Sequence, residues 1–328
     1  MIRIGILGAA GIAPQAVIHP ARRRSDLAVT AVASRSAERA RQYAATHGIA
    51  DAYGSYAELV ARPDVDVVYV ALPPSEHVEW SIAAVEAGKD VLCEKPIAMN
   101  AGEAAQLAEV AARTGRHVIE AFHDHYHPLT AFLGALRGSD RLGAITSIDT
   151  SFDADNPYFP GSIRHVPALG GGALMDLGCY PVHWIRAFLQ AEPVVESASY
   201  VPGPAAADES ITARLRSGDT AVTLGASMAA GVPFAAPFRA VGERGSVEVD
   251  NLVLPHRGHS VRVVVDGVAS THTVGGGETY DYQLDALVAA VTSGATAATE
   301  GHDYLANMRL IDAIYGAAGV PRPSSPAM

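Results

Sequence analysis

The chain has 328 residues, 49% hydrophobic and 18% charged, with a formal net charge of -11, which indicates a globular protein large enough for two domains. The negative charge argues against a nucleic-acid surface, because phosphates are neutralised by clustered lysines and arginines, and no apolar run reaches the roughly 20 residues that span a bilayer. The two cysteines, Cys93 and Cys179, lie far apart, as is usual in a reducing compartment, so we expect a cytoplasmic protein without a membrane partner.

A strand, a tight turn and a helix open the chain. The apolar run over residues 2–7 meets GAAGIAPQAVI, which follows the dinucleotide fingerprint G-x-G-x-x-G with alanine at its second and third glycines. Small residues let the backbone turn sharply and approach a pyrophosphate, whose charge then lies at the helix N-terminus. Close packing also selects small residues in such a turn, so the motif alone leaves both explanations open. The candidate cofactor contacts in it are Gly8, Ala10, Gly11, Ile12 and Ala13.

Strands and helices then alternate up to residue 122. Helical patterns follow the strand-like runs at 27–35, 64–73 and 90–96, and the run HVIEAF at 117–122 closes the series. Alternation of this kind predicts a doubly wound parallel sheet of Rossmann type, with six strands in residues 1–122. Ligands of such α/β sheets bind beyond the carboxyl ends of the strands.

One of these strands ends in VLCEKPIA, residues 91–98, where Glu94 and Lys95 interrupt an apolar run. An ionised group without a partner loses several kcal/mol or more on leaving water, so either neighbours pair with both charges or the charges face a cleft. Their place at the end of a strand favours the cleft for Lys95. We expect Glu94 to orient or compensate charge beside the cofactor rather than to contact substrate.

The end of the second strand indicates which dinucleotide is bound. An acidic residue there would accept hydrogen bonds from the ribose 2′-hydroxyl of NAD, whereas Ser34 and Arg35 offer a donor and a cation to the 2′-phosphate of NADP. NADP is therefore the expected cofactor and NAD the alternative. A solvated helix start, with Ser36 as N-cap, would explain the same residues without a ligand.

From about residue 144 the pattern changes to period-2 strands joined by glycine-rich and polar turns, which predicts an α+β domain with a large, predominantly antiparallel sheet. Among its early strands lies GGGALMDLGCYPVHWIRAFL, residues 170–189. Asp176, Tyr180 and His183 are spaced there by four and three, so they would share one face of an α-helix. We expect the first domain to span residues 1–122 and the second residues 123–328, with a C-terminal helix that packs back on the first domain.

Three stretches resemble the Gfo/Idh/MocA family of oxidoreductases, namely GAAGIA, EAGKDVLCEKPIA and IRHVPALGGGALMDLGCYPVHW. The resemblance covers nearly the whole chain. It implies that Lys95 lies near nicotinamide and substrate, that Tyr180 is the acid/base residue and that Asp176 supports it. His183 stands where another form of the family motif has aspartate, and LPPSEH has Pro74 in place of the usual asparagine.

The same resemblance implies further binding residues. Those expected at the cofactor are Leu72, Pro73 and His77, and those expected at the substrate are His123, His125, Arg164 and His183. Arg164 would either bind substrate hydroxyls or brace the loop before the glycines. His123, His125 and His127 alternate, so on a strand they would share a face, and three imidazoles can bind zinc. The family uses no metal, and we expect none.

Together with these residues, the resemblance implies an NADP-dependent oxidoreductase that transfers hydride between nicotinamide and a carbinol carbon of a small-molecule sugar, polyol or cyclic diol. A lysine beside Tyr180 would favour the phenolate and stabilise a developing alkoxide. Two alternatives stay open, a glycosidase-type enzyme that recycles a tightly held NAD and a cofactor-binding regulator without turnover. The resemblance and the broad one-sided sheet also predict a homodimer or a higher homo-oligomer.

Overall fold

The structure is a computed structural model that describes residues 1–320. The chain forms two compact units. Unit 1 comprises Met1–His123 and Tyr280–Leu305, and unit 2 comprises Asp124–Thr279 and the chain from Ala306 onward. Unit 1 thus includes a segment from near the C-terminus. Within the described residues, none of the helices combines the length and the apolar character that crossing a membrane requires.

Unit 1 contains a six-stranded sheet in the order β3-β2-β1-β4-β5-β6, in which every neighbouring pair is parallel. Its strands are β1 (Ile2–Leu7), β2 (Leu27–Ala33), β3 (Asp51–Tyr53), β4 (Val67–Val70), β5 (Asp90–Cys93) and β6 (Val118–Glu120). This order is the Rossmann order, and it confirms the predicted doubly wound sheet. The strand order reverses between β1 and β4, so their carboxyl ends border the place where such sheets bind ligands.

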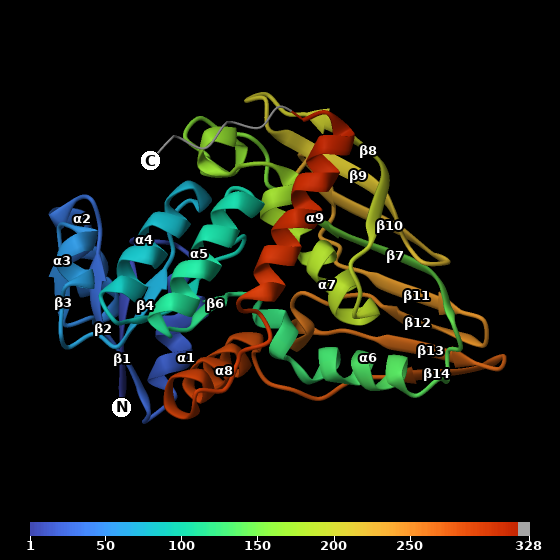
Figure 1. Cartoon of the computed structure of the whole chain (residues 1–328), viewed down its shortest axis with the longest axis horizontal. Helices are drawn as coiled ribbons and strands as arrows, with labels where there is room; N and C mark the ends of the chain where they lie inside the picture. Colours follow the sequence, from blue (N-terminus) through green and yellow to red (C-terminus); the bar gives the residue numbers. More distant parts are fainter. Residues whose placement is uncertain (321–328) are drawn as a thin grey trace. The chain divides into compact units, whose positions relative to one another are not determined.

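The helices of unit 1 follow known capping rules. In α2 (Ala37–His47) the Ser36 side chain accepts a hydrogen bond from a first-turn amide, and Gly48 ends the helix with a left-handed φ of 58°. In α5 (Ala101–Thr114) the Asn100 side chain caps the first turn in the same way. Figure 1 shows α4 and α5 side by side. The remaining helices are η1 (Pro14–Ile18, π-helical), α1 (His19–Arg22), α3 (Tyr56–Val60), α4 (Pro74–Glu86) and α8 (Thr279–Ser293).

The segment that returns to unit 1 completes its core. Leu284 and Leu287 of α8 are fully buried in the same apolar cluster as Ile4 and Ile6 of β1. A buried leucine contributes roughly 1.5–3 kcal/mol relative to an exposed one. The Rossmann sheet of this chain therefore depends on residues that lie far beyond residue 122.

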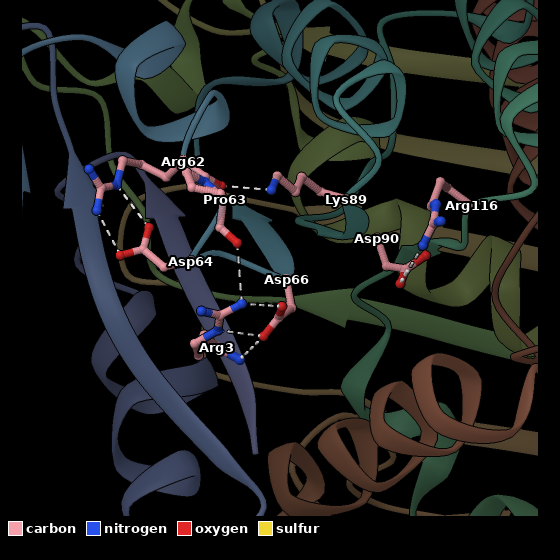
Figure 2. A network of polar contacts seen from close by, with 8 residues as sticks. All are labelled: Arg3, Arg62, Pro63, Asp64, Asp66, Lys89, Asp90 and Arg116. Carbon is pink, nitrogen blue, oxygen red and sulfur yellow. Dashed lines mark hydrogen bonds and ion pairs between the residues drawn. The ribbon is translucent and has the colours of Figure 1, made fainter.

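Charged residues at the amino-terminal edge of this sheet pair with one another (Figure 2). Arg3 binds Asp66 through two nitrogens, at 2.7 and 2.9 Å. The Lys89 ammonium, just before β5, donates to the Arg62 carbonyl at 2.7 Å. These partners give the charges at this edge a structural role, whereas ligands of α/β sheets bind at the opposite edge.

Unit 2 contains an eight-stranded sheet in the order β14-β13-β12-β11-β7-β10-β9-β8. Its strands are β7 (Ile145–Asp153), β8 (Val194–Pro202), β9 (Asp208–Ser217), β10 (Thr220–Ser227), β11 (Phe238–Gly242), β12 (Gly245–Val249), β13 (Val261–Val265) and β14 (Val268–His272). Only the β7–β10 pair of this sheet is parallel. The predicted, predominantly antiparallel sheet is therefore confirmed. The clearest period-2 stretches of the sequence correspond to β7, β9, β10, β12 and β13.

One face of this sheet is covered by helices. A π-helical turn, η5 (Leu174–Gly178), leads directly into α7 (Cys179–Leu189), and both pack on β7 and β10. The helix α9 (His302–Ala318) begins with residues of unit 1 and continues in unit 2. The other helices are η2 (His123–Tyr126), α6 (Pro128–Gly138), η3 (Ile163–His165), η4 (Pro167–Leu169) and η6 (Pro255–Arg257).

The opposite face of the central strands is polar. Arg239 on β11 lies 3.8 Å from Asp149 on β7 and 3.0 Å from Glu248 on β12, and Arg262 on β13 lies 3.9 Å from Glu248. An exposed apolar area was part of the reason to expect a homo-oligomer, and these strands do not provide one. Exposed valines lie on the flanking strands, at Val194 and Val268, so the oligomer stays a prediction.

Candidate active site

The turn after β1 lies where the strand order of unit 1 reverses. Gly8 has a φ of 101°, and a Cβ atom at this position would overlap the carbonyl oxygen of Ala71, just beyond β4. Only glycine fits such a backbone comfortably. A Cβ at Gly11 would meet no atom within 4 Å, so this side of the turn is open. The turn therefore fits a dinucleotide, which needs backbone that a pyrophosphate can approach.

The turn continues into the π-helical turn η1, with Pro14 at the first helical position. Ala13, Ala16 and Val17 are fully buried, which fixes the start of the helix against the sheet. Ala10 and Ile12 are partly buried against the same core. The small residues of the fingerprint therefore serve two purposes, because some allow close packing and others leave the turn open.

The residues expected to read the 2′-phosphate lie beyond β2. Ser34 is buried, and the Arg35 side chain is 77% exposed, with Glu76 at 3.6 Å. Arg39, in the first turn of α2, donates to the carbonyl oxygen of Ala9 at 3.0 Å. This second cation therefore lies against the nucleotide-binding turn. Sequence analysis missed Arg39, although its place four residues after Arg35, within the first turn of a helix, could have identified it.

Glu94 is anchored to the neighbouring strand β4. Its backbone amide donates to the Val70 carbonyl at 2.9 Å, and its Oε1 atom accepts from the Tyr69 hydroxyl at 2.5 Å. Burial, together with the nearby Glu94 charge, raises the pKa of Tyr69 well above its usual value, so the phenol stays protonated and donates. Lys95 follows, half-buried, with a cis peptide bond to Pro96.

The loop after Lys95 is held by two buried side chains. His77 is 1% exposed and places its ring nitrogens 2.8 Å from the carbonyl oxygens of Pro96 and Leu72. Burial lowers the pKa of His77 to about 4, so the ring is neutral at pH 7 and donates to one of these carbonyls. The Ile97 amide donates to Oε1 of Glu120 at 2.7 Å, and Glu120 is fully buried. Glu120 was not predicted, although a glutamate in the apolar run HVIEAF could have indicated it.

In unit 2, the glycines before Tyr180 pack against the segment that carries Arg164. Gly171 and Gly172 donate to the carbonyls of Val166 and Arg164 at 3.0 and 2.9 Å, and a Cβ at Gly171 would lie 2.7 Å from the Arg164 oxygen. The Arg164 side chain lies 3.0 Å from Asp176. This ion pair is a contact of the bracing kind, and substrate binding by Arg164 stays a prediction.

Tyr180 lies in the first turn of α7 and is 5% exposed. Its ring centroid lies 5.5 Å from that of Phe152 on β7 and 6.2 Å from that of Trp184. Tyr180 and His183 lie three residues apart in α7, as the predicted shared face requires. Asp176 precedes them in the π-helical turn η5 rather than in the α-helix that the prediction assumed.

His123 and His125 lie on the 3₁₀-helix η2 and His127 is the N-cap of α6, so the assumption of a strand with three imidazoles on one face was wrong. The His123 ring lies 4.2 Å from that of Tyr280, and the His125 ring lies 4.9 Å from that of His183. In residues 1–320, no group of three or more His, Cys, Asp or Glu side chains is placed to hold a metal ion. A cavity of about 370 Å³, counting space open to solvent, is lined by His125, Thr130, Leu133, Gly134, His183, Trp184, Ala187, Phe188, Phe238 and Leu252.

Both halves of the chain match known sequences. The profile described as "Oxidoreductase family, NAD-binding Rossmann fold" matches residues 2–122, and that of the "GFO/IDH/MocA C-terminal domain" matches residues 133–248. A D-xylose 1-dehydrogenase (NADP(+)) of Haloferax volcanii is 34% identical over 316 residues, which cover 96% of each chain. The chain belongs to the Gfo/Idh/MocA family of oxidoreductases. It is accordingly an NAD(P)-dependent oxidoreductase with a Rossmann domain.

Other similar proteins cover much of this Gfo/Idh/MocA chain. A trans-1,2-dihydrobenzene-1,2-diol dehydrogenase of Xenopus tropicalis is 32% identical over 226 residues, 68% of this chain and 67% of its own. A 3-ketoreductase from Actinomadura kijaniata, solved in complex with NADP and TDP-benzene, is 27% identical with a TM-score of 0.87 and covers 96% of this chain and 97% of its own. The resemblance inferred from the three sequence motifs is confirmed.

Protonation of His127 should make this Gfo/Idh/MocA protein less stable as the pH falls. Its Nδ1 atom caps α6 by accepting from the Leu129 amide at 3.1 Å, and burial, then His259 and His256, lower its pKa to about 4. The unfolded chain takes up this proton near pH 6.5 and the folded chain only near pH 4, so stability is lost as pH falls between these values. His127→Asn keeps a capping acceptor, and we expect a shallower loss from pH 7 to pH 4.5 in urea unfolding. Equal losses for both proteins would contradict this assignment.

Proposed function

We propose that the protein is an NADP-dependent oxidoreductase that transfers hydride between nicotinamide and a carbinol carbon of a sugar, polyol or cyclic diol. The observation that carries this proposal is the position of Lys95 just beyond the carboxyl end of β5. Glu94, which precedes it, accepts a hydrogen bond from Tyr69, and the loop that follows it is held by His77 and Glu120. The names of the relatives support the substrate class, because they include a D-xylose dehydrogenase and a dihydrobenzenediol dehydrogenase.

The residues present fit such a cofactor. The open turn Gly8–Ala13 would receive the pyrophosphate, and Ser34, Arg35 and Arg39 would surround the 2′-phosphate. Leu72, Pro73 and His77, at the carboxyl end of β4, would line the nicotinamide side. When bound, the nicotinamide supplies the hydride acceptor or donor.

The remaining chemistry belongs to this chain's side chains. In oxidation, Tyr180 accepts the proton of the substrate hydroxyl, and in reduction it returns a proton to the carbonyl oxygen. Tyrosine has an ordinary pKa near 10, so an ammonium is needed to favour the phenolate at neutral pH and to stabilise the charge that develops on the substrate oxygen. We assign this task to Lys95. Asp176, which is tied to Arg164, supports the helical segment of Tyr180, and His123, His125 and His183 would contact substrate hydroxyls.

Cofactor choice is testable at Arg35. Changing Arg35 to Asp should weaken NADP binding much more than NAD binding, because only NADP carries a 2′-phosphate that needs a cation. Fluorescence titration with both dinucleotides measures the two Kd values. Glu76→Gln is the matched control, because it removes the acidic partner of Arg35 and leaves the cation. Equal losses for NADP and NAD in the Arg35 variant would show that this residue does not read the phosphate.

The reaction class is tested by adding NADP+ to purified protein with a panel of sugars, polyols and cyclic diols and following the absorbance of reduced cofactor. We expect at least one of these alcohols to reduce NADP+. Release of nitrophenol from a nitrophenyl glycoside without net cofactor reduction would instead favour the glycosidase-type alternative. Cofactor binding without turnover of any compound would favour the regulator.

A further inference from the structure

The helical segment that carries Tyr180 is held at its start by a buried pair of side chains. The Oδ2 atom of Asp208, the first residue of β9, accepts a hydrogen bond from the Leu174 amide at 2.8 Å. The Tyr315 hydroxyl on α9 donates to Oδ1 of the same carboxylate at 2.9 Å. Asp208 is 1% exposed and Tyr315 3% exposed, so water does not compete for either bond. The carboxylate therefore links three elements that are far apart in the sequence.

The glycine motif makes this link possible. Gly172 has a φ of 137°, and a Cβ atom there would overlap the Asp208 carboxylate and come within 2.8 Å of the Tyr315 hydroxyl. A residue with a side chain would therefore push the pair away from the Leu174 amide. The Asp208–Tyr315 pair therefore explains why residue 172 is glycine, just as the backbone of the Arg164 segment explains Gly171.

Two further contacts fix the residues between Leu174 and Tyr180. Asp176 lies 3.0 Å from the Arg164 side chain. The fully buried Asn307 of α9 donates to the carbonyl oxygen of Cys179 at 3.4 Å. Three positions just before Tyr180 are thus tied to three different parts of unit 2. Of these three contacts, the one from Asp208 is a hydrogen bond between a carboxylate and a backbone amide at the start of a helical segment. Charge-assisted hydrogen bonds of this kind are stronger than neutral ones.

We propose that Asp208, held by Tyr315, is a positioning residue that sets the direction in which the Tyr180 side chain leaves its helix. The proposal rests on the acid/base role proposed for Tyr180. A phenol acts on the substrate proton only within hydrogen-bond reach, and a displacement of about 1 Å far from the chemistry can cost about a hundredfold in rate. Loss of the pair should therefore lower turnover without weakening the dinucleotide site of unit 1.

The direct test compares Tyr315→Phe and Asp208→Asn with the wild-type protein. Tyr315→Phe removes one hydroxyl and keeps the ring, and we expect kcat to fall about tenfold; Asp208→Asn should lower it about ten- to hundredfold. The Kd for NADP should stay within about twofold in both variants. The control is Tyr304→Phe on the same helix, because the Tyr304 hydroxyl is also buried but makes no hydrogen bond within the described residues. This control should keep wild-type turnover.

A second measurement separates positioning from loss of folded protein. If Asp208 acts through Tyr180, Asp208→Asn should have less than about a twofold effect on kcat in a Tyr180→Phe background, since coupled residues are not additive. The proposal would be overturned if Asp208→Asn lowered kcat by the same factor in the wild-type and Tyr180→Phe backgrounds. It would also be overturned if Asp208→Asn and Tyr315→Phe each kept wild-type turnover. Wild-type turnover in Tyr180→Phe itself would instead overturn the proposed role of Tyr180. If Asp208→Asn fails to fold, Tyr315→Phe carries the same comparison.

Discussion

Changing Lys95 to methionine is expected to lower turnover by at least roughly a hundredfold, comparable to the loss of one preorganised electrostatic stabiliser. Methionine keeps a long side chain and removes the ammonium that we place beside the reacting oxygen. The Kd for NADP should change far less, because the proposed contacts to its phosphates come from the turn after β1 and from the residues after β2. Steady-state kinetics with the best alcohol of the panel and a cofactor titration measure the two effects.

The chain offers a matched control for this variant. Lys89 also flanks β5 but lies at the amino-terminal edge of the sheet, where its ammonium donates to the Arg62 carbonyl (Figure 2). We expect Lys89→Met to lower stability slightly and to leave turnover within about twofold. Wild-type turnover in the Lys95 variant would reduce the VLCEKPIA motif to structural ion pairing, and a large loss in the Lys89 variant would mean that any lysine change at this strand disturbs the fold.

Changing Tyr180 to phenylalanine should lower turnover by a similar factor, because the variant keeps the aromatic ring and loses the group that exchanges the proton. The contacts with Phe152 and Trp184 involve the ring rather than the hydroxyl, so packing should be retained. Thermal unfolding should confirm this with a nearly unchanged Tm. A variant that retains most of its turnover would assign the proton transfer to another group.

The double variant tests whether the two residues act together. Lys95 belongs to unit 1 and Tyr180 to unit 2, and the proposal pairs them in catalysis. If they act on one proton and one oxygen, the double variant should lose much less than the product of the two single losses. Full additivity would show that the two side chains work independently.

The Rossmann sheet was predictable because its buried strands are apolar runs separated by amphipathic helices with caps. Strand β3 has only three residues, of which Asp51 is exposed, so it left no recognisable pattern. Strand β14 is exposed along its whole length, and an exposed strand lacks the alternation that marks a half-buried one. A C-terminal helix was expected to pack back on the first domain, but the sequence did not identify α8 as that helix, because hydrophobic periodicity shows that a helix buries a face but not which sheet covers it.

The candidate site was predictable where chemistry is local to a motif and hidden where it depends on tertiary contacts. Glu94 and Lys95 stand out in an apolar strand, and the glycines before Asp176 stand out in a helix start. The partners of these motifs, Glu120 and Asp208, come from distant strands. Glu120 could be suspected as a single carboxylate in the apolar run HVIEAF, whereas Asp208 is followed by Glu209 and Ser210 and does not stand out. In neither case does the sequence say which amide donates to the carboxylate.

The helical segments that follow the two glycine motifs share a feature, because η1 and η5 are both π-helical turns. A π-helical turn contains one residue more than an α-helical turn would need. Each residue of an α-helix advances the side chains by about 100° around the axis. A chain shortened by one residue between Gly172 and Tyr180 could close this turn as an α-helix and keep the phenol close to its present direction, because the π-helical turn absorbs the extra residue. Two chains with a different number of residues between the glycines and the tyrosine can therefore present the phenol in the same way, which a comparison of residue spacing alone would not show.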